Sequence, residues 1–423
     1  MIFGEGPIIK NIAGDLNKLF LQGSRAGQPI NNVEGSASAD QATAALMADR
    51  DPVIRDISTG LGYAGREVTV SGTGALQLVN SLGRPLTSWS VELAPYQEGS
   101  GDPSPENVRP IHGTDKITFM MAGKNLLDFI VRSQNGIIST KINGVAHITG
   151  TATATTYPVD FVPSVYPAGT YIWSISGLPA GAQCIYTRNG AWAGFVTQGA
   201  SITITAGVTI GGYITIPTGT SVDTETKIQL ELGNTASDFT PFTAASQTVI
   251  TLPYTIYNAA IRDGEGEIRT RYRLYNGASS EFWTYSPSWS KTDTAVFYSN
   301  GAITDGLFDD YNTVFITNCN LFQPKTRQSL YNYDVPGIGY SGDMNPRAPY
   351  LTVRISKTIA STVEEFTAFL ASNPIEIVYQ LITPVQFTIN SPFISTTEGD
   401  GVAWVTAEDG IVTNFSATYL QGE

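Results

Sequence analysis

Apolar and polar residues alternate along much of this chain, which is the pattern of half-buried β-strands. The alternation is clear at residues 201–205 (SITIT), 213–216 (YITI) and 228–232 (IQLEL), and glycine-containing turns lie between these runs. Short strands at this spacing are typical of a two-sheet sandwich. We therefore expect residues 123–243 to form a β-sandwich that no long helix interrupts.

Residues 244–423 combine further strands with a single predicted helix. The strand patterns lie at residues 375–381, 402–405 and 411–419. The helix would cover residues 361–373, with Ser361 or Thr362 as its cap and Glu364 or Glu365 completing a capping box. Its buried stripe would consist of Val363, Phe366 and Leu370.

Strand patterns at residues 86–93 and 116–120 flank a proline-rich loop, residues 101–111 (GDPSPENVRPI). Its three prolines fix φ and push the residue before each into an extended conformation, so the loop cannot be helical. A lone hairpin is only marginally stable. We therefore predict that residues 76–122 pair with the C-terminal sheet, which makes one discontinuous domain with the sandwich inserted in it.

The first 75 residues differ in character, with two short helix candidates between glycine- and serine-rich connectors. The candidates cover residues 15–22 and 39–57, and the first carries an apolar stripe formed by Leu16, Leu19 and Phe20. Such short helices cannot bury an apolar face alone. They would dock either on the rest of the chain or, as we favour, on another protein.

The length of the chain indicates several domains, and its low content of charged residues indicates contact with neighbouring subunits. The 423 residues exceed what one core usually holds, since domains cluster near ~100–150 residues. Charged residues make up 14% of the chain against a typical ~25%, while hydrophobic residues reach 42%. That profile fits a β-rich extracellular or virion protein whose surface is partly covered by neighbouring subunits.

The net charge of −13 argues against nucleic acid as a partner, because phosphate binding needs clustered basic residues and the 24 here are scattered. An acidic surplus can also serve solubility alone. The longest apolar stretch, residues 206–216, is shorter than the ~20 residues of a membrane span, so no membrane insertion is expected. Residues 1–7 lack the basic and apolar regions of a signal peptide, so export by that route is not expected.

No catalytic residue, metal site or cofactor is predicted. Cys184 and Cys319 lie far apart without zinc-site spacing, and both are expected to be buried. His112 and His147 have no flanking nucleophile motif. Residues 263–267 (DGEGE) lack the full calcium-loop pattern and indicate a hairpin turn. A glycosidase stays open as an alternative through three acidic residues of predicted loops, Asp102, Asp309 and Asp310.

Two aromatic clusters are the candidate ligand-binding sites, since sugar rings stack on flat aromatic faces while nearby polar groups orient their hydroxyls. The first surrounds the Asn189-Gly190 turn and consists of Tyr186, Arg188, Asn189 and Trp192. The second consists of Trp283, Tyr285 and Trp289. The alternative for both clusters is a place in the core or in a subunit interface.

Several motifs occur in an order that resembles the minor tail and baseplate structural proteins of bacteriophages. They are the proline-rich loop with residues 123–128 (GKNLLD), then 150–157 (GTATATTY), 167–171 (PAGTY), 229–233 (QLELG) and 239–242 (FTPF), and finally 363–366 (VEEF), 370–373 (LASN) and 379–384 (YQLITP). The resemblance covers roughly residues 76 to 423. It implies a mainly β fold with a carbohydrate-binding-like jelly roll and a second β domain carrying one helix. The residue pattern, and not the resemblance, predicts the short, partly helical N-terminal attachment segment.

The resemblance also implies a function. The chain would be a non-enzymatic virion protein of the tail tip, baseplate or tail fibre, assembled in the host cytoplasm. Its partners would be other tail and baseplate proteins, reached through Leu16, Leu19 and Phe20, and a host cell-wall glycan. A homo-oligomer, favouring a trimer, is expected because low-charge sheet edges need neighbours. The alternatives are a glycan depolymerase, a capsid-attached fibre or decoration protein, and a carbohydrate-binding module of a cellular adhesin.

Overall fold

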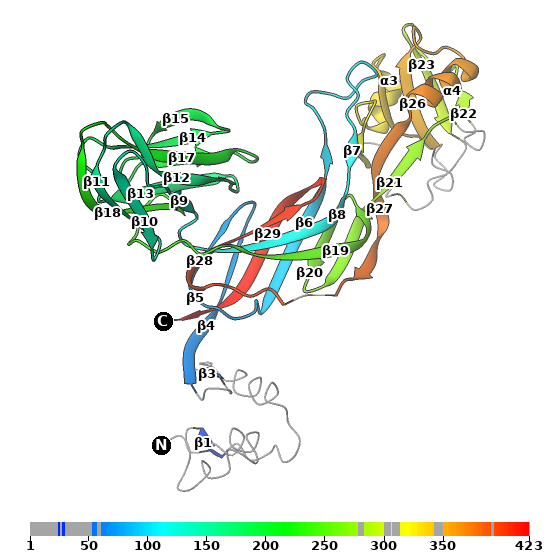
Figure 1. The fold of residues 1–423 in the computed structure, drawn as a ribbon. Helices are drawn as coiled ribbons and strands as arrows, with labels where there is room; N and C mark the ends of the chain where they lie inside the picture. Colours follow the sequence, from blue (N-terminus) through cyan, green and yellow to red (C-terminus); the bar gives the residue numbers. More distant parts are fainter. Residues whose placement is uncertain are drawn as a thin grey trace.

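The chain is mainly β in the computed structural model (Figure 1), as predicted. The structure describes residues 24–25, 28–29, 53–56, 61–277, 283–299, 306, 314–341, 350–390 and 393–422. The helix predicted over residues 15–22, with Leu16, Leu19 and Phe20, lies outside these residues. So do Asp309 and Asp310. Near the N-terminus, β1 (Ser24–Arg25) pairs with β2 (Gln28–Pro29).

The predicted sandwich is confirmed over residues 129–232, which form two antiparallel sheets of five strands each. One sheet has the order β10 (Ile137–Ile142), β11 (Val145–Thr151), β18 (Ser221–Leu232), β13 (Gly169–Ser176) and β16 (Ser201–Ile204). The other has the order β15 (Ala191–Phe195), β14 (Gln183–Arg188), β17 (Thr209–Ile216), β12 (Thr156–Val165) and β9 (Phe129–Val131). Apolar residues of both sheets, among them Phe161 and Trp173, form one core. We call this unit the jelly roll.

A second, larger sheet has thirteen strands. Ten of them follow the order β19 (Ser246–Ile256), β8 (Thr114–Gly123), β28 (Glu398–Ala407), β5 (Leu76–Leu82), β29 (Gly410–Gly422), β6 (Ser88–Gln97), β20 (Ala259–Arg262), β21 (Glu265–Tyr275), β27 (Ile375–Thr388) and β24 (Ile316–Cys319). The pairing predicted between residues 76–122 and the C-terminal strands is present, because β8 and β5 pair with β28 and β6 pairs with β29. The jelly roll is thus inserted between β8 and β19.

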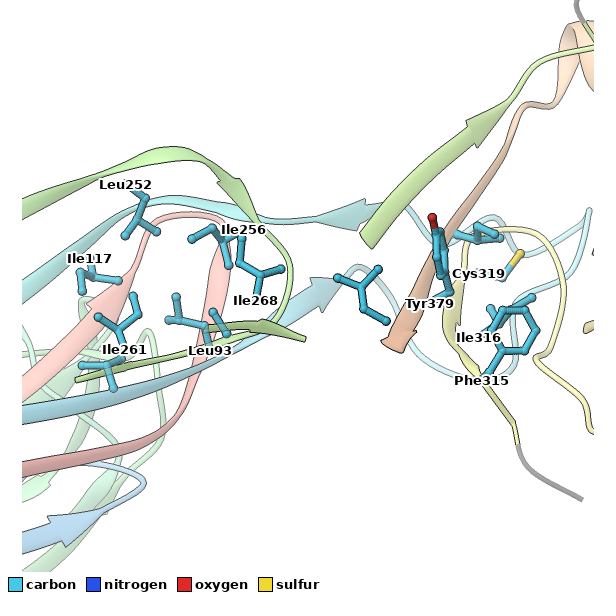
Figure 2. Packing of buried hydrophobic residues seen from close by; sticks show 14 of the residues in the cluster. Leu93, Ile117, Leu252, Ile256, Ile261, Ile268, Phe315, Ile316, Cys319 and Tyr379 are labelled. Atoms are coloured by element: carbon cyan, nitrogen blue, oxygen red, sulfur yellow. The ribbon is translucent and has the colours of Figure 1, made fainter. Parts of the chain in front are cut away.

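The large sheet curls so that its inner face packs on itself. Figure 2 shows Ile117, Leu252 and Ile256 of β8 and β19 facing the apolar side chains of β6, β20 and β21. Tyr254 of β19 meets Phe387 of β27, with ring centroids 6.0 Å apart. A sheet with one apolar face must cover it, and this one does so with its own two ends.

A smaller sheet at the far end of the large one carries both described helices (Figure 1). Its strands have the order β22 (Trp283–Tyr285), β23 (Thr294–Ser299), β26 (Tyr350–Ser356) and β25 (Gly337–Ser341), and its helices are α3 (Arg327–Asn332) and α4 (Val363–Ser372). We call this the terminal unit. The predicted helix is confirmed as α4, with Phe366 and Leu370 buried. The six-residue α3 was not predicted because it is too short to show a helical repeat.

Two predictions about the N-terminal 75 residues need correction. β4 (Leu61–Gly72) pairs with β29 through residues 65–72, so the large sheet begins before the predicted boundary at residue 75. β3 (Val53–Asp56) pairs with β4, so the helix predicted over residues 39–57 is wrong at its C-terminal end, while residues 39–52 lie outside the described part of the chain. Pairing with a distant strand overrides local periodicity here.

The jelly roll is attached to the large sheet by packing and by an ion pair. Val402 of β28 is buried in the jelly-roll core, and Trp404 packs against it. Lys124, which follows β8, donates to Asp400 with an N–O distance of 3.0 Å. These contacts fix the jelly roll on the large sheet.

The N-terminus of α4 allows a direct test of its capping box. The Thr362 hydroxyl accepts from the Glu365 N–H, and the Glu365 carboxylate accepts from the Thr362 N–H. Thr362→Ala is expected to cost about 1 kcal/mol of stability, because a helix donor loses its acceptor. Urea unfolding of the purified chain would measure the loss. Thr362→Ser keeps the hydroxyl and should retain most of the stability; a serine variant as weak as the alanine variant would contradict the assignment.

Candidate functional site

Two exposed aromatic side chains on the edge strand β15 mark the candidate site. Trp192 is 63% exposed and Phe195 is 51% exposed. Their rings meet edge to face with centroids 6.0 Å apart. Large apolar side chains gathered at the surface of a folded domain indicate a binding surface.

A turn and a bulge place these two rings together. Asn189 and Gly190 have φ values of 50° and 79°, the left-handed backbone that a two-residue hairpin turn between β14 and β15 requires. Residues three apart in a regular strand face opposite sides. One extra residue of β15, Ala193, forms a bulge opposite Tyr186 and Thr187, so that Thr187 lies opposite Trp192 and Ile185 opposite Phe195. Both rings therefore lie on one face of the sheet.

Three of the four residues predicted for the first cluster make contacts within the fold. Tyr186 packs against the core, with its ring centroid 6.0 Å from that of Trp173. Arg188 donates to the Thr203 carbonyl at 2.9 Å, and the Asn189 side chain accepts from the Thr209 N–H at 2.9 Å. Of the two rings in this cluster, only that of Trp192 lies at the surface, because Tyr186 faces the core side of the sheet.

The three residues of the second predicted cluster pack within the terminal unit. Trp283 is only 6% exposed and packs edge to face on Phe366 at 4.9 Å. Tyr285 is half-buried against Phe297. Trp289 packs on Tyr331 at 4.7 Å. The core alternative is therefore correct for Trp283, and all three side chains belong to the packing of the terminal unit.

Two tyrosines that the sequence analysis missed lie on the same face as Trp192 and Phe195. Tyr213 of β17 lies opposite Ile185, and its ring meets that of Tyr157 edge to face at 5.3 Å. Tyr157 is 45% exposed. The alternation along β17 could have predicted this position. The buried residues of β17 include Ile210, Ile214 and Ile216, so the side chain at position 213 points outward.

Hydrogen bonds hold the pKa of four carboxyls of the described residues below the ordinary range, namely Glu267, Asp334, Glu365 and Asp400. Asp102 lies exposed in the proline-rich loop.

The histidines and cysteines have structural surroundings. His112 pairs with Glu98 at 2.8 Å and His147 with Glu225 at 3.4 Å. Both cysteines are buried, and burial raises the pKa of the Cys319 thiol to about 12. Within the described ranges, no three histidine, cysteine or acidic side chains group as metal ligands would. None of the helices described there is long and apolar enough to span a membrane.

Comparison with known proteins identifies no relative, since no family model matches the chain and no curated protein matches it. The site therefore has to be interpreted from its own geometry. That geometry is a sheet face with exposed aromatic rings and, beside them, hydroxyl and carboxylate groups. Such a face can stack on and hydrogen-bond to a ligand without changing it chemically.

Proposed function

We propose that this chain is a structural protein of a bacteriophage tail tip, baseplate or tail fibre whose jelly roll binds a host-surface glycan without covalent chemistry. The observation that carries the binding function is the exposed Trp192 and Phe195 pair on the outer face of the jelly roll. The ordered motifs shared with phage minor tail proteins support the structural role. The large sheet would join the jelly roll to neighbouring virion proteins.

Sugar binding suits this surface better than exposure to water alone. An aromatic ring at the surface forgoes the burial that would stabilise it in a core. Pyranose rings have an apolar face that stacks on an aromatic ring and hydroxyls that need polar partners.

Adsorption of phage particles that carry Trp192→Ala tests this function. We expect adsorption affinity to fall roughly tenfold, because a lost stacking contact of about 0.5–1.5 kcal/mol adds to the lost apolar area. Particle yield should not change, since Trp192 is exposed. Phe393→Ala is the matched control, because Phe393 is 87% exposed but lies in the segment between β27 and β28 of the large sheet.

Three outcomes would contradict the proposal. Purified particles that lack the chain would exclude the structural role. Release of oligosaccharide when the purified protein is incubated with host wall polysaccharide would favour the depolymerase alternative. Equal loss of adsorption in the Trp192 and Phe393 variants would indicate a general surface effect instead of a site.

A further inference from the structure

One side chain from each strand of the sheet β15-β14-β17-β12-β9 lies in a single row across its outer face. Strand register aligns them in the order Phe195, Ile185, Tyr213, Asp160 and Ile130. Their chain neighbours Cys184, Ile214 and Phe129 point the other way, into the jelly-roll core. The row therefore lies on the side away from that core. Phe195 and Ile130 at its two ends are 51% and 49% exposed, whereas Ile185 within it is only 7% exposed.

A second, shorter row widens the aromatic end of the first. It contains Gly211, Thr187 and Trp192 in register. Gly211 is buried, and a side chain there would come within 3.1 Å of the Thr187 hydroxyl and 3.5 Å of Pro163, so glycine lets the neighbouring residues of this row pack closely.

An ion pair lies toward the other end of the row, next to the apolar Ile130. The Asp160 carboxylate accepts from Arg132 Nε at 2.7 Å, and the two side chains are 26% and 60% exposed. Each group keeps hydrogen-bonding capacity beyond this one bond, since a carboxylate has about four acceptor sites and a guanidinium has five donors. This pair can therefore bind vicinal hydroxyls as acceptor and donor.

We propose that this face binds a linear, uncharged oligosaccharide that runs across the five strands, with one end stacked at Trp192 and Phe195 and the other hydrogen-bonded at Asp160 and Arg132. The inference rests on the proposed glycan-binding function and specifies its ligand. Neighbouring strands lie about 4.8 Å apart, so the row spans about 19 Å. That spacing is close to the length of one pyranose unit in an extended chain, and the row fits about four units.

Charge selects a neutral ligand over an anionic one. Asp160 occupies a position inside the row, and the nearby positive charge of Arg132 is already paired with it. The chain as a whole carries a net charge of −13. A uronate or phosphate-bearing glycan would approach against this field, whereas hydroxyl groups would not. A second copy of the chain, equally acidic, is a poorer occupant for the same reason.

Isothermal titration of the full chain with a panel of linear oligosaccharides tests the ligand class. The panel contains neutral gluco-, manno-, galacto- and N-acetylglucosamine series and, as the anionic series, oligogalacturonates. We expect a neutral series to bind with affinity that rises from disaccharide to tetrasaccharide and then levels off at the hexasaccharide. Binding of the anionic series alone, of no series, or of a disaccharide as tightly as a tetrasaccharide would overturn the inference.

Two variants locate the ligand on the row. Phe195→Ala should weaken tetrasaccharide binding at least fivefold and leave disaccharide binding at the polar end less affected. Asp160→Asn keeps the side-chain volume but removes the charge. It should therefore lower the affinity for the neutral oligosaccharides and reduce the ratio of that affinity to the affinity for oligogalacturonate. Phe393→Ala should change nothing. Tetrasaccharide binding that survives both row variants would place the ligand elsewhere.

The alternative occupant and the proposed function have separate readouts. If Trp192→Ala converts an oligomer to a smaller species in sedimentation, the face is a contact between copies and the inference fails. If the chain binds a neutral tetrasaccharide through the row but is absent from purified particles, the phage assignment fails and the ligand assignment stands. If particles contain the chain and adsorb normally after substitution of the row, the phage assignment stands and the ligand assignment fails.

Discussion

Trp173→Ala is expected to destabilise the jelly roll by about 3–5 kcal/mol, the usual cost of removing a large aromatic side chain from a core. Trp173 is fully buried at the centre of β13. Its ring stacks on Phe161 with centroids 6.0 Å apart and meets Tyr186 at the same separation. Alanine would leave a cavity among these rings that the two sheets cannot close without moving.

Hydrogen exchange followed by mass spectrometry would localise this effect. Peptides from β12, β13 and β17 should exchange faster, while those from the large sheet should change little, because the two units have separate apolar clusters. Trp192→Ala is the matched control, since the same residue type is removed from an exposed position. Similar exchange in the two variants would contradict the assignment of Trp173 as a core anchor.

Trp173→Phe separates ring packing from hydrogen bonding. The indole N–H of Trp173 is buried and meets no acceptor among the residues that the structure describes. Phenylalanine keeps most of the ring contacts and removes this unsatisfied donor. Its cost should therefore be much smaller than that of alanine.

Arg354→Ala is expected to destabilise the terminal unit by about 3–5 kcal/mol, because it leaves buried acceptors without donors. Arg354 of β26 is fully buried. Its guanidinium donates to the Leu330 carbonyl, to the Trp289 carbonyl at 2.8 Å and to the Thr294 hydroxyl at 2.7 Å. Through these bonds one side chain ties α3 and the segment after β22 to the sheet.

The negative charge of Asp334 partly compensates the buried positive charge of Arg354. Burial lowers the pKa of the guanidinium, and Asp334 opposes that shift. The Asp334 carboxylate accepts from the Thr294 hydroxyl, and this bond lowers the pKa of Asp334. A neutral side chain at position 354 would remove both the hydrogen bonds of the guanidinium and its electrostatic interaction with Asp334, which is linked to it through the Thr294 hydroxyl.

Exchange rates in β23, β25 and β26 provide the measurement for Arg354→Ala, with the jelly-roll peptides as an internal reference. Arg354→Met keeps much of the aliphatic volume of the side chain. It should still lose most of the stability that Arg354→Ala loses, since the carbonyls remain unsatisfied. Arg262→Ala is the control, because the Arg262 side chain is 78% exposed. Equal protection of β26 in the Arg354 and Arg262 variants would show that the buried network contributes little.

Much of the fold follows from local patterns. Alternation predicts the strands of the jelly roll because one side of each strand is buried and the other is not. The α4 helix is predictable because its cap, its acidic first turn and its apolar stripe all lie within a dozen residues. Pairing of residues 76–122 with the C-terminal strands is also predictable, since a hairpin needs a sheet to be stable.

The candidate site was predicted only in part. Trp192 was identified because it follows a recognisable hairpin turn. Tyr186, Arg188 and Asn189 were assigned with it on the basis of sequence proximity, yet they face the core or hold the hairpin in place. Phe195 joins Trp192 only through the bulge opposite Tyr186 and Thr187, and a bulge is a property of two paired strands.

Periodicities and turn residues within short segments were enough to predict the mainly β fold of this protein, the insertion of one domain in another and the position of its main helix. Three features depend instead on the three-dimensional arrangement of strands: the row from Phe195 to Ile130, the curling of the large sheet on itself and the separate terminal unit. Each of these depends on register between strands distant in the chain. Register is set by the summed packing of whole faces, which no local pattern contains.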